Sequence, residues 1–144
     1  MSDTPLKLRA KDEEDVQVVS AILQDAIAPL SDMTYNPDAK NFIMVVHRLR
    51  REAKQQGLER VCCAVNVQGV VQTQSQGIDQ THQARILDLL AVIPEKQSLT
   101  FIFAGNAQIR LQLQNWSMII EDFGAPWPAQ CAPCHDQAEN TNKA

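Results

Sequence analysis

At 144 residues, with 44% hydrophobic and 21% charged residues, the chain has the size and composition of a folded domain that needs neither disulfides nor a metal to bury a core. Its net charge of −4 favours solubility and argues against nucleic acid as the main partner. The longest apolar run, 42–46, is too short to cross a bilayer, and the N-terminus lacks the basic and apolar stretches of a secretory signal. We therefore expect a cytoplasmic protein without a membrane span, whose four cysteines remain thiols.

The N-terminal part of the chain predicts a short strand followed by an amphipathic helix. Apolar and charged residues alternate over 6–10, which is typical of a strand with one solvent-exposed face. Asp12 can cap a helix whose acidic first turn suits the positive end of the helix dipole. Apolar residues then recur at three- and four-residue spacing up to Leu30, and Pro29 would end the helix, so we place it over 12–28.

From Leu30 onward the period of the apolar residues changes from 3.6 to 2, and turn residues follow at short intervals. This pattern predicts antiparallel strands joined by hairpins. A β-branched and apolar run predicts one strand over 42–49, and alternating apolar residues predict the next over 61–67. Gln68-Gly69 would then be the turn of a second hairpin, leading into a strand over 70–76.

The next segment, 79–91, fits either a helix or a strand, and we favour a short helix that runs into a strand before Pro94. Gly105-Asn106 lies between two alternating runs, 99–104 and 107–113, and is the clearest hairpin signal in the chain. Since a strand, an acidic turn and a helix would then occur twice, an internal duplication stays open as an alternative.

Together these elements predict an α+β fold: a predominantly antiparallel, curved or barrel-like sheet of about seven or eight strands, crossed by one N-terminal amphipathic helix and accompanied by a second, short helix as an option. The segment 126–128 should form an ordered but irregular closing arm. We place a single domain over 1–130. The remainder, 131–144, offers little to bury and should be a poorly ordered tail.

The most specific motif lies in that tail. Cys131, Cys134 and His135 have the C-x-x-C-H spacing that attaches haem covalently, but such attachment follows export and few residues remain to wrap the cofactor. A zinc site through the same residues is the better metal hypothesis, although a fourth ligand must come from elsewhere. The alternative is a tail that contains two cysteines by chance, and we assign no metal or cofactor.

Two features of the sequence could indicate nucleic-acid binding, but neither is specific. The basic stretch 47–51 has the charge to contact phosphates, and Phe101 with Phe103 on one strand face could stack on bases. Charges at the open end of a hairpin are usually solvated, and alternating phenylalanines usually belong to a core. We therefore do not expect nucleic acid to be the partner.

No catalytic nucleophile, base or metal set converges in the sequence, so we assign no catalytic residue. The leading hypothesis is a non-enzymatic binding or protein-interaction module, with an unknown protein partner or self-association. The alternative is a small enzyme with a polar site built from Arg60, Arg110, Glu121, Asp122 and Trp127. A metal-binding protein that uses Cys131, Cys134 and His135 is a further alternative.

Several short segments, spread over about residues 5 to 128, resemble a family of small proteobacterial proteins catalogued as a domain of unknown function. The resemblance implies a bacterial cytoplasmic protein without an assigned activity, cofactor or partner, and it does not extend to the C-x-x-C-H motif. The segments that carry it are Leu6-Lys7-Leu8-Arg9-Ala10, Asp32-Met33, Glu59-Arg60-Val61, Gln74-Ser75-Gln76-Gly77-Ile78, Leu89-Leu90-Ala91, Phe103-Ala104-Gly105, Ile109-Arg110-Leu111 and Glu121-Asp122-x-Gly124-x-Pro126-Trp127-Pro128.

Overall fold

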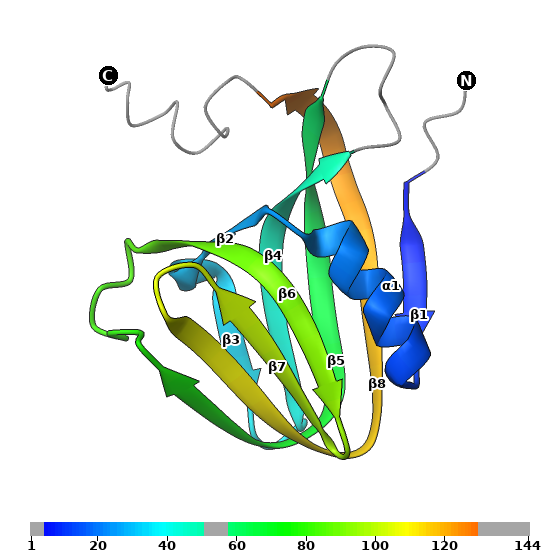
Figure 1. The fold of residues 1–144 in the computed structure, drawn as a ribbon, viewed down its shortest axis with the longest axis vertical. Helices are drawn as coiled ribbons and strands as arrows, with labels where there is room; N and C mark the ends of the chain where they lie inside the picture. The colour runs from blue at the N-terminus through cyan, green and yellow to red at the C-terminus, as the bar shows by residue number, and fades with distance from the viewer. Residues whose placement is uncertain (1–4, 51–57, 130–144) are drawn as a thin grey trace.

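The computed structural model describes residues 5–50 and 58–129. Within these ranges the chain forms one α-helix, one short 3-10 helix and eight strands (Figure 1). In chain order the elements are β1 (Lys7–Ala10), α1 (Glu13–Leu23), β2 (Ala26–Pro29), η1 (Leu30–Asp32), β3 (Met33–Asn36), β4 (Asn41–Arg50), β5 (Glu59–Gln76), β6 (Ile86–Glu95), β7 (Ser98–Phe103) and β8 (Ala107–Pro128).

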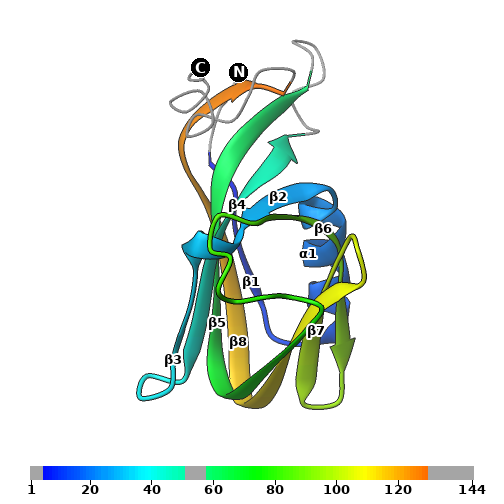
Figure 2. The ribbon, with the colours of Figure 1, turned by 90° about the vertical axis from the view of Figure 1, so that its left-hand side faces the viewer.

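Six of the strands close into an antiparallel barrel in the order β8, β5, β4, β2, β6, β7, and β7 pairs back with β8. Two short strands lie outside this ring: β1 pairs with β8, and β3 pairs with β4. The structure therefore confirms an α+β fold with a predominantly antiparallel, barrel-like sheet. Helix α1 lies beside β1 and packs against β6 (Figures 1 and 2).

The core fills the barrel because alternate residues of neighbouring strands point inward. Met44 on β4, Val65 on β5 and Ile120 on β8 occupy matching register positions, and none of them is exposed to solvent. Helix α1 contributes its apolar stripe, Val16, Val19 and Leu23, to the same core. These contacts hold the helix against the barrel, since burying each such side chain stabilises the fold by about 1.5–3 kcal/mol.

The N-terminal cap of the helix is confirmed, but its predicted end is wrong. The side chain of Asp12 accepts a hydrogen bond from the backbone N–H of Asp15 at 2.9 Å. The helix ends at Leu23 rather than at 28, because Asp25 adopts a left-handed φ of 69° and turns the chain into β2. Ala26 and Leu30, which the prediction placed on the apolar face of the helix, are instead buried together with Ala28 at the strand period of two.

The predicted turn at Gln68-Gly69 is also wrong, because β5 continues through it as an 18-residue strand. Gly69 sits at a register shift between β5 and β8, with a φ of 86°. An added Cβ there would lie 2.4 Å from the backbone oxygen of Gln114, so only glycine fits. The strand is thus bent by a bulge rather than reversed by a hairpin.

Two further expectations fail in the second half of the described chain. The segment 79–91 contains turns followed by β6, and residues 58–129 contain no helix. The optional second short helix is therefore absent from this range. An internal duplication would need the same helix. The segment 126–128 is the end of β8 rather than a separate arm, with Trp127 opposite Arg60 in register, and a register irregularity lies between it and Phe123. The hairpin at Gly105-Asn106 is confirmed.

Beyond the barrel, β5 and β8 continue as a paired ribbon with the end of β4 alongside β5, and Figure 1 shows this extension rising toward the upper end of the molecule. Among the described residues, no helix combines the length and apolar character that a membrane span requires. The predicted tail, 131–144, lies outside the described residues.

Candidate functional site

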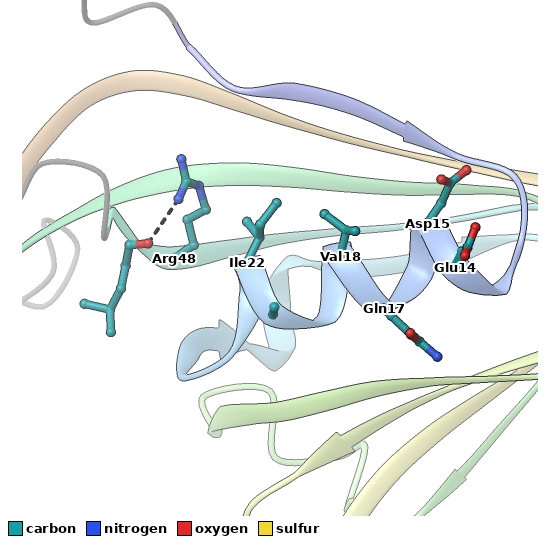
Figure 3. Close-up of a pocket in the computed structure, with 8 residues that line it drawn as sticks. Glu14, Asp15, Gln17, Val18, Ile22 and Arg48 are labelled. Carbon is teal, nitrogen blue, oxygen red and sulfur yellow. Dashed lines mark hydrogen bonds between the residues drawn. The ribbon is translucent and has the colours of Figure 1, made fainter.

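A groove of about 720 Å³ runs along helix α1. We call it the helix groove. Its described lining consists of one face of the helix and the end of β4 (Figure 3), namely Glu14, Asp15, Gln17, Val18, Ala21, Ile22, Arg48 and Leu49. Its volume lies within the range of ligand-binding pockets in proteins.

Helical spacing brings apolar and acidic side chains into this groove. Asp15, Val18 and Ile22 follow one another at three- and four-residue steps and point to the same side of the helix in Figure 3. Val18 is 53% exposed, although the other valines of the helix are buried. Glu14 and Asp15 belong to the first turn, so the groove has an apolar middle and an acidic end.

At the opposite end of the groove a buried ion pair supports the wall. Arg48 Nε donates to Asp122 Oδ1 at 2.8 Å, and Arg48 Nη2 donates to Asp122 Oδ2 at 2.7 Å. The two side chains are only 2% and 6% exposed. Arg48 Nη1 also donates to the backbone oxygen of Leu49 at 3.0 Å, which is the dashed line in Figure 3. Because its charge is neutralised inside the protein, Arg48 shapes the groove without making it basic.

Asp122 also ties β1 to the barrel. The backbone N–H of Leu6 donates to Asp122 Oδ2 at 3.3 Å, and the backbone N–H of Asp122 donates to the Leu6 oxygen at 2.9 Å. Cys63 lies beside this carboxylate on the inward face of β5. Burial, and secondarily the negative charge of Asp122, raises the pKa of the Cys63 thiol from 9.0 to about 12, so the group is neutral and unreactive at neutral pH.

The outward face of the same strands carries a second set of contacts. The rings of His47 and Trp127 meet edge to face, with centroids 5.4 Å apart. Arg60 Nη1 donates to the backbone oxygens of His47 at 2.8 Å and Asp25 at 3.2 Å. These contacts fasten β2, β4 and the outer part of the β5–β8 ribbon to one another.

A family described as "Protein of unknown function (DUF2948)" matches residues 6–135, which is most of the chain. The chain belongs to this family. No curated protein and no solved structure matches it. The DUF2948 match extends past the end of the resemblance at 128 and so includes the C-x-x-C-H motif.

The structure does not bring together the residues of the hypothetical polar enzyme site. Arg60 and Trp127 are cross-strand neighbours, but Glu121 and Asp122 point to opposite faces of β8, the former exposed and the latter buried. Arg110 lies on the same strand eleven residues before Glu121, on the other side of the bulge at Gly69.

The metal motif, Cys131, Cys134 and His135, lies outside the described residues. Within 5–50 and 58–129, no group of three or more histidine, cysteine or acidic side chains is arranged to hold a metal ion. Cys62 and Cys63, the two cysteines in these ranges, form no disulfide.

The two signals for nucleic acid do not form a binding surface among the described residues. Phe101 and Phe103 are buried in the core and cannot stack on bases. In the basic stretch, His47 is buried, Arg48 pairs with Asp122, and Arg50 Nη1 lies 2.7 Å from Glu59 Oε1. The last residue of that stretch, at position 51, lies outside the described residues.

Sequence reasoning missed the helix groove, although two signals for it were present. Val18 falls outside the apolar stripe of the helix, which marks an apolar side chain with no place in the core. Arg48 follows Phe42, Met44 and Val46 at a period of two, so it had to point inward. A buried arginine requires a buried acid, and that partner could not be identified without the strand order.

Proposed function

We propose that the protein is a non-enzymatic, cytoplasmic bacterial binding module, one domain over 1–130, that holds a short segment of a partner protein in the helix groove. The observation that carries this proposal is the composition of the groove, in which an exposed apolar middle leads into an acidic end. The segment that fits is one with apolar side chains next to a lysine or arginine.

Charge and apolar surface both support this occupant. Val18, Ala21 and Ile22 offer apolar contacts that would leave water on binding, which is the main favourable term in association. Glu14 and Asp15 at the acidic end favour a cationic side chain over an anionic one. Arg48 contributes no opposing charge, because Asp122 neutralises it.

The lining also favours binding over catalysis. None of the described residues of the groove is a histidine, cysteine, serine or threonine, so its described wall has no hydroxyl or thiol nucleophile beside an imidazole base. The buried thiol of Cys63, with its pKa raised to about 12, is not activated either.

The test is a selection from a random peptide library displayed on phage, with the full-length chain as bait. We expect enriched peptides in which apolar residues flank lysine or arginine, and we expect V18K to weaken their binding by about tenfold or more, since ~1.4 kcal/mol of contact energy would be lost. Glu14→Lys should weaken binding as well. The matched control is Val71→Lys, because Val71 is a 40% exposed valine on β5 outside the groove.

Two outcomes contradict the proposal. One is a set of enriched peptides without basic residues, or with affinities that V18K leaves unchanged while its thermal melt matches that of the unaltered chain. The other is a dimer, detected by light scattering, that V18K converts to a monomer, which would assign the groove to a second copy of this chain.

A further inference from the structure

A smaller pocket lies on another side of the barrel, where the last part of β5 leaves β4. The register between these strands ends at Gln68, whereas β5 stays paired with β8 as far as Gln76. Figures 1 and 2 show the end of β5 curving away from β4. From Val70 onward, therefore, one edge of β5 has no strand partner among the described residues.

This pocket, which we call the β5-edge pocket, has a volume of about 190 Å³. Its floor is apolar and is formed by the buried side chains of Leu30, Phe42 and Ile109. Strand β3 forms one wall, and there the hydroxyl of Tyr35 donates to the backbone oxygen of Val70 at 3.0 Å. Hence β3 is fixed against β5 where the free edge of β5 begins.

The opposite wall is a polar loop that hydrogen bonds hold in place. Gln80 Nε2 donates to Ser75 Oγ at 3.0 Å, and Gln83 Nε2 donates to the backbone oxygen of Gln80 at 2.5 Å. The loop is anchored behind by Arg85, whose Nη1 donates to the Gly77 oxygen at 2.9 Å. The amide oxygens of Gln80 and Gln83 accept no hydrogen bond from a described residue and remain available as acceptors.

Charge is absent from the described lining of this pocket. Its polar members are glutamines, threonines, a serine and a tyrosine, and none of its described residues is acidic, basic or a histidine. An ionised ligand would lose hydration here without gaining an opposite charge, so the pocket discriminates against it. Side-chain amides present a donor and an acceptor side by side, which complements a ligand edge of the same kind.

From these observations we propose that the β5-edge pocket binds an uncharged, single-ring small molecule with an amide-type edge, such as a pyrimidine base or a carboxamide-substituted ring. Its volume is close to that of apolar cavities, of about 150 Å³, that accept one benzene ring. The ring lies on Phe42 and Ile109, and its edge bonds to the amides of Gln74, Gln80 and Gln83.

The experiment is NMR titration of the ¹⁵N-labelled full-length chain with uracil, nicotinamide and nicotinate. Nicotinamide and nicotinate form a matched pair, because they share ring and size and differ in charge. A ligand of this size should bind with a Kd on the order of 1 mM. We expect both uracil and nicotinamide to shift the backbone resonances of Ser75, Ile78 and Gln80, and nicotinate to bind at least about tenfold more weakly.

Substitutions distinguish binding in this pocket from unspecific binding elsewhere on the protein. Gln80→Glu should reduce the affinity for nicotinamide, because it introduces a negative charge beside the ring, whereas Gln72→Ala on the exposed part of β5 should not. The proposal is overturned if neither neutral compound shifts these resonances at about 10 mM, ten times the expected Kd. It is likewise overturned if nicotinate binds as well as nicotinamide, or if Gln80→Glu leaves the affinity unchanged.

Discussion

Arg48 on β4 and Asp122 on β8 form a two-point ion pair across β5, although their own strands do not pair with each other. In register, Arg48 stands opposite Val61 and Asp122 opposite Cys63, so the contact runs diagonally over the inward face of β5. Asp122 also binds the backbone of Leu6. One buried carboxylate thus joins β1, β4 and β8 at the point where the barrel meets the helix groove.

Removing one partner of this pair should strongly destabilise the fold. Asp122→Asn leaves the charge of Arg48 buried and uncompensated, which typically costs about 3–5 kcal/mol. Arg48→Met should cost a similar amount, because it leaves the carboxylate of Asp122 buried and uncompensated. The free energy of unfolding, measured by urea denaturation, checks both.

The double substitution Arg48→Met with Asp122→Leu is the informative control, since it removes both charges and should recover most of the lost stability. Glu59→Gln tests the less buried pair with Arg50, whose side chains are 11% and 20% exposed, and should cost much less. Single variants of the buried pair that cost no more than Glu59→Gln would show that the diagonal contact contributes little to stability.

The buried thiol of Cys63 should be protected from alkylation. It is fully buried, and desolvation raises its pKa to about 12, so at pH 8 the reactive thiolate forms only after unfolding. Cys62, on the opposite face of β5, is partly exposed and should react first with iodoacetamide. Peptide mass spectrometry after timed labelling distinguishes the two, and equal rates in the folded protein would contradict the assignment.

The same thiol should make stability fall at alkaline pH. Below pH 9.0 the thiol is protonated in both the folded and the unfolded chain, so its full contribution to the free energy of unfolding is present. Between pH 9.0 and about 12 only the unfolded chain releases the proton. Stability is therefore lost as pH rises, with a slope of up to about 1.4 kcal/mol per pH unit. Because other groups titrate in this range, the measurement is the difference in slope between the unaltered chain and Cys63→Ala. Identical slopes would refute the raised pKa.

Gly69 and Gly124 provide a matched test of the bulge in β5. Both have positive φ, 86° and 76°, but an added Cβ at Gly69 would lie 2.4 Å from the Gln114 oxygen, while one at Gly124 would meet nothing within 4 Å. Gly124→Ala should cost only the left-handed conformation, about 1–2 kcal/mol. Gly69→Ala should cost a further 1–3 kcal/mol, roughly, for the steric conflict. Equal melting temperatures for the two variants would show that the bulge relaxes freely.

These tests concern features that the sequence indicated to different degrees. The hairpin at Gly105-Asn106 and the inward alternation of 61–67 were predictable, because they depend on turn chemistry and a period of two within a short segment. The cap at Asp12 was predictable for the same reason. Each is a local property of neighbouring residues.

The errors arise where a distant strand decides the local conformation. Nothing near Ala26–Pro29 forbids a helix before Pro29, but pairing of that segment with β6 and β4 makes it a strand. Gly69 reads as a turn residue until β8 is present to continue the pairing on its far side. The helix groove and the partner of Arg48 could not be identified for a related reason, since both depend on which strands close the barrel.

Ser20 and Val92 provide the last test, on the contact that fixes α1 to the barrel. Pairing between β2 and β6 stops at Leu89, and beyond it the helix lies along β6, where Ser20 Oγ accepts a hydrogen bond from the backbone N–H of Val92 at 2.8 Å. Ser20→Ala leaves this part-buried N–H without its acceptor and should cost about 1–3 kcal/mol. Hydrogen exchange at Val92 should accelerate accordingly, because helix and strand separate more easily. Ser31→Ala, at an exposed serine of η1, is the control that should change neither quantity. Unchanged exchange at Val92 in the Ser20 variant would mean that the buried stripe of Val16, Val19 and Leu23 alone holds the helix in place.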